Sequence, residues 1–158
     1  MKKVRLISSA AMLALLSVGT VTFMSCGKED CPVGMEGNNC DKEIRAEMIG
    51  TYNATDVNDA DATEVYTYNP VVTTGATVSV INVSKFGDFF TNTEIVTANV
   101  TKTNDVISFD IPTQKPDGAY TVSGSGTYTI STKKLVVNYG LTSPGGATEN
   151  YTGNWTKQ

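Results

Sequence analysis

A strict alternation of apolar and polar residues marks one stretch of the chain, residues 120–130. One set of positions is apolar or glycine and the other is Thr or Ser, so that Tyr120, Val122, Gly124, Gly126, Tyr128 and Ile130 alternate with Thr121, Ser123, Ser125, Thr127 and Thr129. A period of two over this length predicts a β-strand with one apolar and one solvated face. Gly124 and Gly126 fall on the apolar face, where missing side chains permit a long strand to bend.

The same kind of pattern extends over most of the chain after Ile49, where Thr, Val, Tyr and Asn replace the good helix formers. Apolar faces continue through Val96, Ala98 and Val100, and through Ile107, Phe109 and Ile111. We therefore predict an all-β domain with strands near residues 49–56, 62–69, 76–84, 94–101, 105–111, 119–131, 134–141 and 147–157. Short connections, such as residues 102–104, favour antiparallel neighbours in an up-and-down meander. Eight such strands can close into a barrel whose interior is filled by side chains or holds one small ligand.

A different pattern precedes the predicted strands. A basic start, residues 1–5, is followed by a mostly apolar and uncharged run over residues 6–24. This arrangement predicts a secretory signal peptide, and the alternative is an uncleaved membrane span, for which the run is long enough. The segment Phe23-Met24-Ser25-Cys26 resembles the lipobox of bacterial lipoproteins, although Phe23 stands where Leu is usual. The resemblance implies that residues 1–25 are removed and that an acylated Cys26 anchors the chain in a membrane.

Two further cysteines follow the lipobox. With Cys26 acylated, Cys31 and Cys40 remain as a pair in an oxidising compartment, where a disulfide is expected. Their spacing and turn residues resemble the C-terminal hairpin of an EGF-like module, whose other four cysteines are absent here. We interpret the hairpin as a stapled spacer; a recognition role and free or intermolecular thiols are the alternatives.

A short helix is predicted between this hairpin and the first strand. Asp41 can cap a helix over residues 42–48, with Ile44 and Met48 on its buried side. The predicted organisation is therefore a signal peptide (1–25), a lipid-anchored linker (26–47) and a β-barrel domain (48–158).

Composition limits what the exported chain can do. Removal of residues 1–25 leaves 9 basic and 16 acidic residues, a net charge of −7. Such a chain repels phosphate, so we expect no nucleic-acid partner. The sequence contains no histidine, which excludes Ser-His-Asp and Cys-His catalysis and His-ligated metals. We expect no enzyme activity, no cofactor and no metal site.

An acidic cluster and an aromatic group are the candidate sites that remain. The oxygen-bearing residues of 56–64 (Asp56, Asn58, Asp59, Asp61 and Glu64) fail the EF-hand spacing, because Asp61 stands where glycine is needed. We predict a solvated hairpin tip, and a looser calcium site is the alternative. Tyr66 and Tyr68 are two positions apart and therefore share one face of a predicted strand, and Tyr151 and Trp155 share one face of the last strand. These four residues form either a platform for a sugar or apolar ligand or part of the core.

The loop over residues 85–90 holds Phe86, Phe89 and Phe90. A loop this apolar has two interpretations, a plug at one end of the barrel and an exposed tip that meets a partner.

Two segments carry a family resemblance. Residues 49–55, Ile-Gly-Thr-Tyr-Asn-Ala-Thr, and residues 123–128, Ser-Gly-Ser-Gly-Thr-Tyr, are similar to the lipocalin-like β-meander lipoproteins of the Bacteroidetes. Lys28-Glu29-Asp30 also resembles the charged tag that sends such lipoproteins to the outer face of the outer membrane; a solvated linker is the alternative. The resemblance implies a lipid-anchored protein of the cell outer membrane, and it supports the fold more than any activity.

Two functions are consistent with these features. The first is a non-catalytic envelope lipoprotein whose barrel binds a small molecule or glycan. The alternative is a structural or protein-interaction module of an envelope assembly, with a filled barrel. Cavity volume separates them, since a pocket of roughly 300 Å³ or more lined by aromatic residues favours ligand binding.

Overall fold

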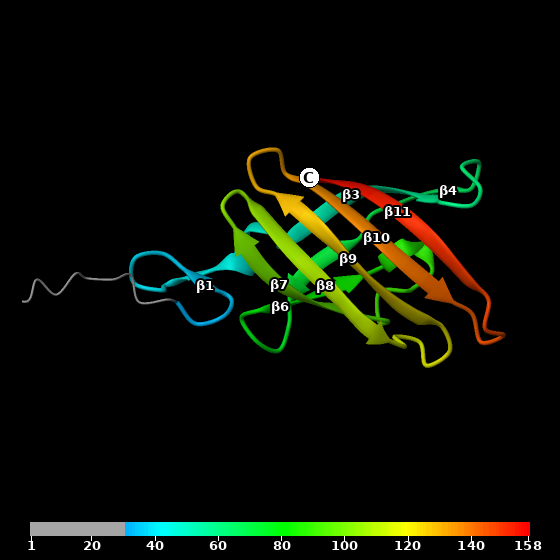
Figure 1. Ribbon diagram of the computed structural model, residues 1–158, viewed down its shortest axis with the longest axis horizontal. Coiled ribbons are helices and arrows are strands. Elements are labelled where there is room, and N and C mark those ends of the chain that lie inside the picture. Colours follow the sequence, from blue (N-terminus) through cyan, green and yellow to red (C-terminus); the bar gives the residue numbers. More distant parts are fainter. Residues whose placement is uncertain (1–30) are drawn as a thin grey trace, which may run out of the picture.

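The computed structural model describes residues 31–158, and most of them belong to one antiparallel sheet that closes on itself (Figure 1). The strands of the sheet are β3 (Gly50–Asn58), β4 (Val65–Tyr68), β5 (Val71–Thr74), β6 (Val80–Ser84), β7 (Val96–Thr103), β8 (Val106–Gln114), β9 (Thr121–Thr129), β10 (Lys134–Thr142) and β11 (Thr148–Lys157). Closure comes from β11, which pairs with β3. The predicted signal peptide (1–25) and acylation site (Cys26) lie outside the described residues.

Two of these nine strands share one position in the barrel. β4 pairs with residues 54–57 of β3, and β5 pairs with Gly50 and Thr51 of the same strand. Pro70 lies between β4 and β5, and because proline has no N–H, it interrupts the ladder of hydrogen bonds. The described chain therefore forms an eight-position antiparallel meander barrel, which confirms the predicted all-β fold.

One predicted strand and one predicted connection were wrong in detail. Residues 76–84 were predicted as one strand, whereas residues 75–79 form a turn and β5 is a separate strand before it. β5 has only four residues between Pro70 and Gly75, too few for its composition to outweigh the turn signals at its ends. The hairpin predicted at residues 102–104 turns instead at Asn104 and Asp105, where Asn104 adopts a positive φ of 55°.

Strand β9 has the predicted register. Val122 and Tyr128 are buried, whereas Ser125 and Thr127 are exposed. Tyr120 is an exception, because it precedes the strand and is 40% exposed. The alternation in the sequence continues past the point where β9 begins, so it could not locate the end of the strand.

Gly124 and Gly126 face the interior, as predicted, although neither has a positive φ. A Cβ at Gly126 would meet the ring of Phe109 and the carbonyl oxygen of Val136, and a Cβ at Gly124 would lie 2.7 Å from the Cβ of Tyr139. Close approach of side chains and of β10 therefore requires glycine here, and the backbone angle does not. An aromatic ring packed over a strand glycine also fixes the register of neighbouring strands.

The short helix predicted over residues 42–48 is absent from the described chain. Lys42 and Glu43 form β2, which pairs with β1 (Met35–Glu36), and only the 3₁₀ helix η1 (Ile44–Glu47) follows. Because the β1–β2 ladder holds two of the seven residues extended, too few remain for an α-helix. Ile44 and Met48 are nevertheless buried, as predicted.

We call the end of the barrel next to η1 the closed end. The short turns at 75–79, 104–105 and 130–133 lie there together with the C-terminus (Figure 1). Arg45 is buried, and its Nη1 donates hydrogen bonds to the carbonyl oxygens of Gly75, Thr77 and Val80. Its Nε also donates to Glu43 Oε2 at 2.8 Å. One guanidinium thus ties η1 to the turn between β5 and β6.

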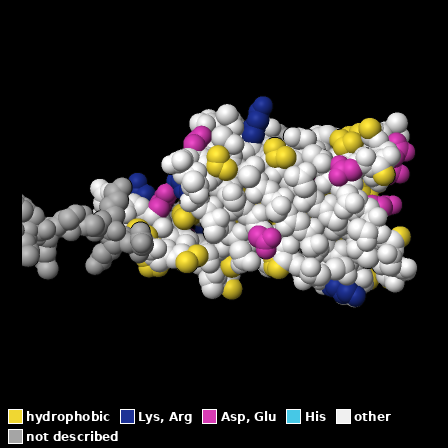
Figure 2. All heavy atoms as spheres, in the orientation of Figure 1, with side chains coloured by type: hydrophobic (Ala, Val, Ile, Leu, Met, Phe, Trp, Pro, Cys, Tyr) yellow, Lys and Arg dark blue, Asp and Glu magenta, His cyan; other side chains and the backbone are white. Residues whose placement is uncertain are grey.

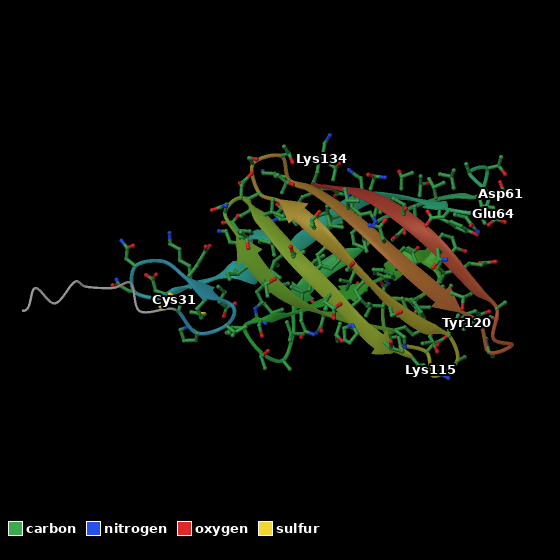
Figure 3. All side chains as sticks on the ribbon, viewed as in Figure 1. Cys31, Asp61, Glu64, Lys115, Tyr120 and Lys134 are labelled. Carbon is green, nitrogen blue, oxygen red and sulfur yellow. A yellow bond between two sulfur atoms is a disulfide. The ribbon has the colours of Figure 1, made fainter. Side chains whose placement is uncertain are left out.

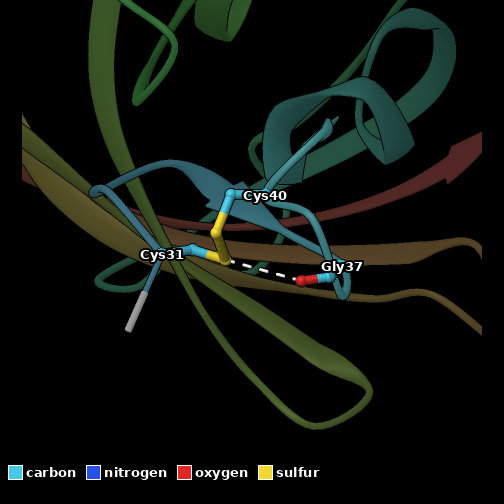
Figure 4. The surroundings of a disulfide bond; sticks show 3 residues. All are labelled: Cys31, Gly37 and Cys40. Atoms are coloured by element: carbon cyan, nitrogen blue, oxygen red, sulfur yellow. Dashed lines mark hydrogen bonds between the residues drawn. A yellow bond between two sulfur atoms is a disulfide. The ribbon is translucent and has the colours of Figure 1, made fainter. Parts of the chain in front are cut away.

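The disulfide hairpin packs against the closed end. Cys31 and Cys40 are bonded to each other, as predicted, and the Cys31 Sγ lies 3.5 Å from the Gly37 carbonyl oxygen (Figure 4). A Cβ at Gly34 would lie 2.8 Å from the backbone of Ser79, so the hairpin touches the barrel directly. Lys102 Nζ on β7 also forms an ion pair with Glu36 Oε2 at 2.6 Å.

Candidate ligand-binding site

Four connections meet at the other end of the barrel, which we call the open end. They join β3 to β4 (residues 59–64), β6 to β7 (85–95), β8 to β9 (115–120) and β10 to β11 (143–147). Figure 3 places Asp61, Glu64, Lys115 and Tyr120 at this end and Cys31 at the opposite one. Loops carried on a rigid scaffold are common positions for binding sites, which makes this end the candidate.

The second of these connections enters the barrel. Its residues 85–90, which we call the plug, include the 3₁₀ helix η2 (Phe86–Asp88). Phe86 and Phe90 are buried, and Phe89 packs on the core while remaining partly exposed. Of the two interpretations of this loop, the structure therefore agrees with a plug.

Gly87 allows the plug to approach the barrel interior. Its φ is +66°, and a Cβ here would lie 2.8 Å from the Tyr139 hydroxyl oxygen and 2.7 Å from the Phe89 ring. Its backbone N–H donates a hydrogen bond of 2.9 Å to the Tyr68 hydroxyl oxygen. Both the conformation and the space at this position therefore require glycine.

The four aromatic residues predicted to form either a ligand platform or part of the core come together inside the barrel. Tyr68, Tyr151 and Trp155 are buried, and Tyr66 is partly buried against the same core. Ring centroids lie 6.0 Å apart both for Tyr66 with Tyr151 and for Tyr68 with Trp155. Protein side chains occupy the space around these rings, so the four residues belong to the core. The cluster lies next to the plug and forms the floor of the open end.

A buried carboxylate lies within this cluster. Asp56 on β3 is 0% exposed and accepts hydrogen bonds from the Tyr68 hydroxyl (2.7 Å), the Tyr139 hydroxyl (2.8 Å) and the Trp155 indole N–H (2.8 Å). Burial raises the pKa of the Asp56 carboxyl, and the three hydrogen bonds oppose that rise. Burial, followed by the charge of Asp56, also raises the pKa of Tyr68 and of Tyr139.

The prediction that Asp56 belongs to a solvated tip was wrong. Asp59, Asp61 and Glu64 are exposed, whereas Asp56 and Asn58 point inward from β3. Alternation provided the signal that was missed, because Tyr52, Ala54, Asp56 and Asn58 share one strand face. At the exposed tip, the hydroxyl and backbone N–H of Thr63 donate to Asp61 and lower its pKa.

A pocket opens above the aromatic cluster. Its volume is about 340 Å³, and its lining comes from the plug, from the β8–β9 and β10–β11 connections and from the adjoining strand ends: Phe89, Tyr120, Leu141, Ser143, Ala147 and Glu149. Phe89 connects the pocket to its floor, because its ring centroid lies 5.1 Å from that of Tyr66 and 5.3 Å from that of Tyr151. The predicted aromatic residues thus support the pocket from below, and others line it.

Hydrogen bonds fix two walls of the pocket. Asp117 Oδ1 accepts from the backbone N–H groups of Ala119 and Tyr120, which holds the β8–β9 connection. On the other wall, Ser143 N–H donates to the Ala147 carbonyl oxygen at 2.8 Å. These local bonds hold the walls without any ligand, which lowers the entropic cost of binding.

A wider and more open hollow lies on the other side of the plug. Its volume is about 480 Å³, and its lining is largely polar, with Thr67, Asn69, Thr91 and Asn92 together with Lys85, Asp88 and aromatic residues of the plug. Phe89 contributes to both hollows. The first pocket is the better candidate for an apolar group because it is more enclosed and its lining is more apolar.

The described part of the chain, residues 31–158, contains no group of three or more His, Cys, Asp or Glu side chains placed to hold a metal ion. It also contains no helix with the length and apolar character needed to cross a membrane.

Comparisons with known proteins connect this barrel to one solved structure. It is a crystal structure of a "putative outer membrane protein" from Bacteroides fragilis, which is similar to this chain with a TM-score of 0.50 and 12% sequence identity. The match covers 73% of this chain and 52% of that one, so the chain spans about half the length of the Bacteroides protein. No family model and no curated protein matches the chain. At this identity the similarity shows a shared fold and leaves activity undetermined.

Proposed function

We propose that this chain is a cell-envelope lipoprotein, anchored in the outer membrane through an acylated Cys26, whose β-barrel binds a small molecule or glycan without catalysing a reaction. The observation that carries the proposal is the pocket of about 340 Å³ at the open end, with Phe89 and Tyr120 in its lining. This volume lies at the lower end of the range typical of small-molecule sites.

The position of the pocket agrees with a lipid anchor. Cys26 precedes the first described residue, Cys31, by five positions, and Cys31 belongs to the hairpin at the closed end. A chain anchored at Cys26 would therefore hold the closed end near the membrane and direct the open end away from it. Such an orientation supports capture of a ligand from the surrounding medium and favours neither the periplasmic nor the outer face.

Several further expectations belong to the same proposal. The chain lacks histidine, so we propose no catalytic role, and its acidic charge supports the absence of a nucleic-acid partner. We propose no cofactor and no metal for the barrel. The fold similarity to a Bacteroides protein described as an outer membrane protein supports the proposed location.

The alternative function is a structural or protein-interaction module of an envelope assembly. A specific observation favours it, because aromatic side chains fill the barrel interior from Tyr52 near the closed end to Phe86 of the plug. In that case the open end would contact a protein partner and the pocket would hold only solvent.

Native mass spectrometry of the full-length protein, extracted from the membranes of the bacterium that produces it, separates the two functions. Ala147→Trp places a large ring in the pocket, and Ala62→Trp makes the same change in the exposed β3–β4 connection outside it. We expect a co-purifying ligand on the wild type and on Ala62→Trp, and its loss from Ala147→Trp. A wild type without ligand would support the structural module, and a ligand retained by Ala147→Trp would place the site elsewhere.

The anchor is tested separately. Growth with labelled palmitate should label the wild type and leave Cys26→Ala unlabelled. Equal labelling of the two proteins would contradict acylation at Cys26.

A further inference from the structure

The chemistry of the pocket indicates which ligands it selects. Phe89 and Tyr120 offer aromatic rings, Leu141 offers an apolar side chain, and Ser143 and Ala147 are small. Among the described lining residues, Glu149 is the one that carries a charge. An apolar pocket with a single carboxylate at its edge has two features that a complementary ligand must match.

The Glu149 carboxylate is held in a defined position. The Tyr151 hydroxyl donates a 2.6 Å hydrogen bond to Glu149 Oε2, and both residues lie on β11. Burial of Tyr151 and this bond to Glu149 together raise the pKa of the Tyr151 hydroxyl, so the hydroxyl keeps its proton for that bond. Within residues 31–158, no second hydrogen bond or ion pair to the Glu149 carboxylate is present, which leaves its other oxygen free to accept from a ligand.

The whole open end reinforces the charge of Glu149. Acidic residues outnumber lysines there in the described chain, with Asp59, Asp61, Glu64, Asp88, Glu94, Asp117 and Glu149 against Lys85 and Lys115. Figure 2 shows acidic side chains beside hydrophobic ones at this end. Summed charge of one sign raises the local concentration of oppositely charged ligands and lowers that of like-charged ones.

We infer that the pocket selects an organic cation, an ammonium group carrying an apolar body, over neutral and anionic molecules of the same shape. The ammonium group donates to Glu149 and lies near the faces of Tyr120 and Phe89, while the apolar body contacts Leu141. Charge-assisted hydrogen bonds and cation–π contacts both favour this arrangement. The inference rests on the proposed binding function and adds the class of ligand to it.

Three probes of matched shape test the inference: 2-phenylethylamine, 2-phenylethanol and phenylacetate. Each carries the same ring on a short chain, and at pH 7 they are cationic, neutral and anionic. Titration of the full-length protein, solubilised in a neutral detergent, is followed by the chemical shifts of backbone amides that line the pocket. We expect the amine to bind about two- to fivefold more tightly than the alcohol, as for a partly exposed ion pair, and the carboxylate to bind most weakly.

Two isosteric variants then locate the effect. Glu149→Gln removes the charge while keeping an oxygen that can accept from Tyr151, and it should abolish the preference for the amine over the alcohol. Asp88→Asn removes one charge from the same end without touching this pocket, and asparagine tolerates the positive φ of 59° found there. This control should retain most of the preference.

The possible outcomes distinguish selection of a cation from the proposed binding function. Equal binding of amine and alcohol to the wild type would overturn cation selection and leave the pocket as a site for neutral ligands. A preference that persists in Glu149→Gln would also overturn the inference. Shifts in none of the three titrations would contradict the pocket itself and hence the proposed binding function.

Discussion

At the closed end Arg45 donates hydrogen bonds to three backbone carbonyls, whereas beneath the open end Asp56 accepts hydrogen bonds from three side chains. Among the described residues, these two are the charged side chains that are buried. The cation satisfies three carbonyl oxygens in and next to the turn between β5 and β6. The carboxylate joins side chains from three strands across the lumen.

One barrel can thus be held shut at one end while a pocket remains at the other. At the closed end, the Arg45 guanidinium bonds directly to backbone carbonyl oxygens, with no side chain between them. The plug, in contrast, is linked to Asp56 through side chains: the Tyr68 hydroxyl accepts from the Gly87 N–H and donates to Asp56, and Phe86 packs on the rings of Tyr139 and Trp155. The connections above the plug are held by local bonds of their own, and the pocket lies among them.

Removal of the carboxylate should have the largest effect on stability. Asp56→Ala leaves three buried donors without their acceptor, and loss of one partner from such a network costs about 3–5 kcal/mol. Urea unfolding should show a decrease of this size in the free energy of unfolding. Asp110→Ala on the exposed face of β8 is the matched control and should change little. Equal effects of the two variants would show that Asp56 does not organise the lumen.

Removal of the guanidinium should have a smaller effect, confined to the closed end. Arg45→Met keeps the apolar stem and removes the donor to Gly75, Thr77 and Val80, at a cost of about 3 kcal/mol. Lys42→Met, at an exposed position next to η1, is the control. Hydrogen exchange should accelerate at the β5–β6 turn and not at the plug. Equal acceleration at both ends would mean that the two ends are energetically coupled.

The sequence predicted the barrel more accurately than it predicted which charged side chains are buried. Alternation located most strands and the interior face of β9, because a half-buried strand must place like residues two apart. It could not find β5, whose four residues lie between two turn signals, nor the 3₁₀ helix, because pairing of β1 with β2 displaced the expected α-helix. Asp56 was assigned to the solvent because of its charge, although its position in the alternation of β3 placed it inside.

The candidate site could be predicted only in part. The four aromatic residues do gather in the structure, since each pair shares a strand face and the barrel brings the faces together. The pocket lining was not predicted, because Phe89 and Tyr120 come from two connections and Glu149 from the start of β11, and these segments meet only when the barrel closes. Their proximity depends on sheet order and register, which no local pattern encodes.

A glycine in the plug should give an intermediate effect at the open end. Gly87→Ala adds both a strained positive φ and a Cβ close to Tyr139, and we expect a loss of about 2 kcal/mol. Gly118→Ala on the β8–β9 connection has a similar φ of +76° with nothing within 4 Å of the added Cβ, so it isolates the cost of the backbone angle. That control should lose about 1 kcal/mol in urea unfolding. If the two variants lose the same amount, the plug does not pack as tightly as described.

The most gradual effect should come from titration of Asp56 itself. Burial raises the pKa of its carboxyl above the value of about 3.9 found in unfolded chains. The folded state therefore holds the proton more tightly than the unfolded state. The contribution of Asp56 to stability is then fully present below about pH 4 and is lost as the pH rises through the raised pKa of the folded state.

Asp56→Asn, which does not titrate, isolates this contribution from that of the exposed acids. The free energy of unfolding of the wild type, minus that of the variant, should fall between pH 3.5 and pH 7 in paired urea titrations. Asp61→Asn serves as a contrast, because hydrogen bonds from Thr63 lower the pKa of Asp61 and give the opposite slope. A difference for Asp56 that rises with pH would mean that the bonds from Tyr68, Tyr139 and Trp155 outweigh burial. The lumen would then stabilise a charged carboxylate, as the closed end stabilises a charged guanidinium.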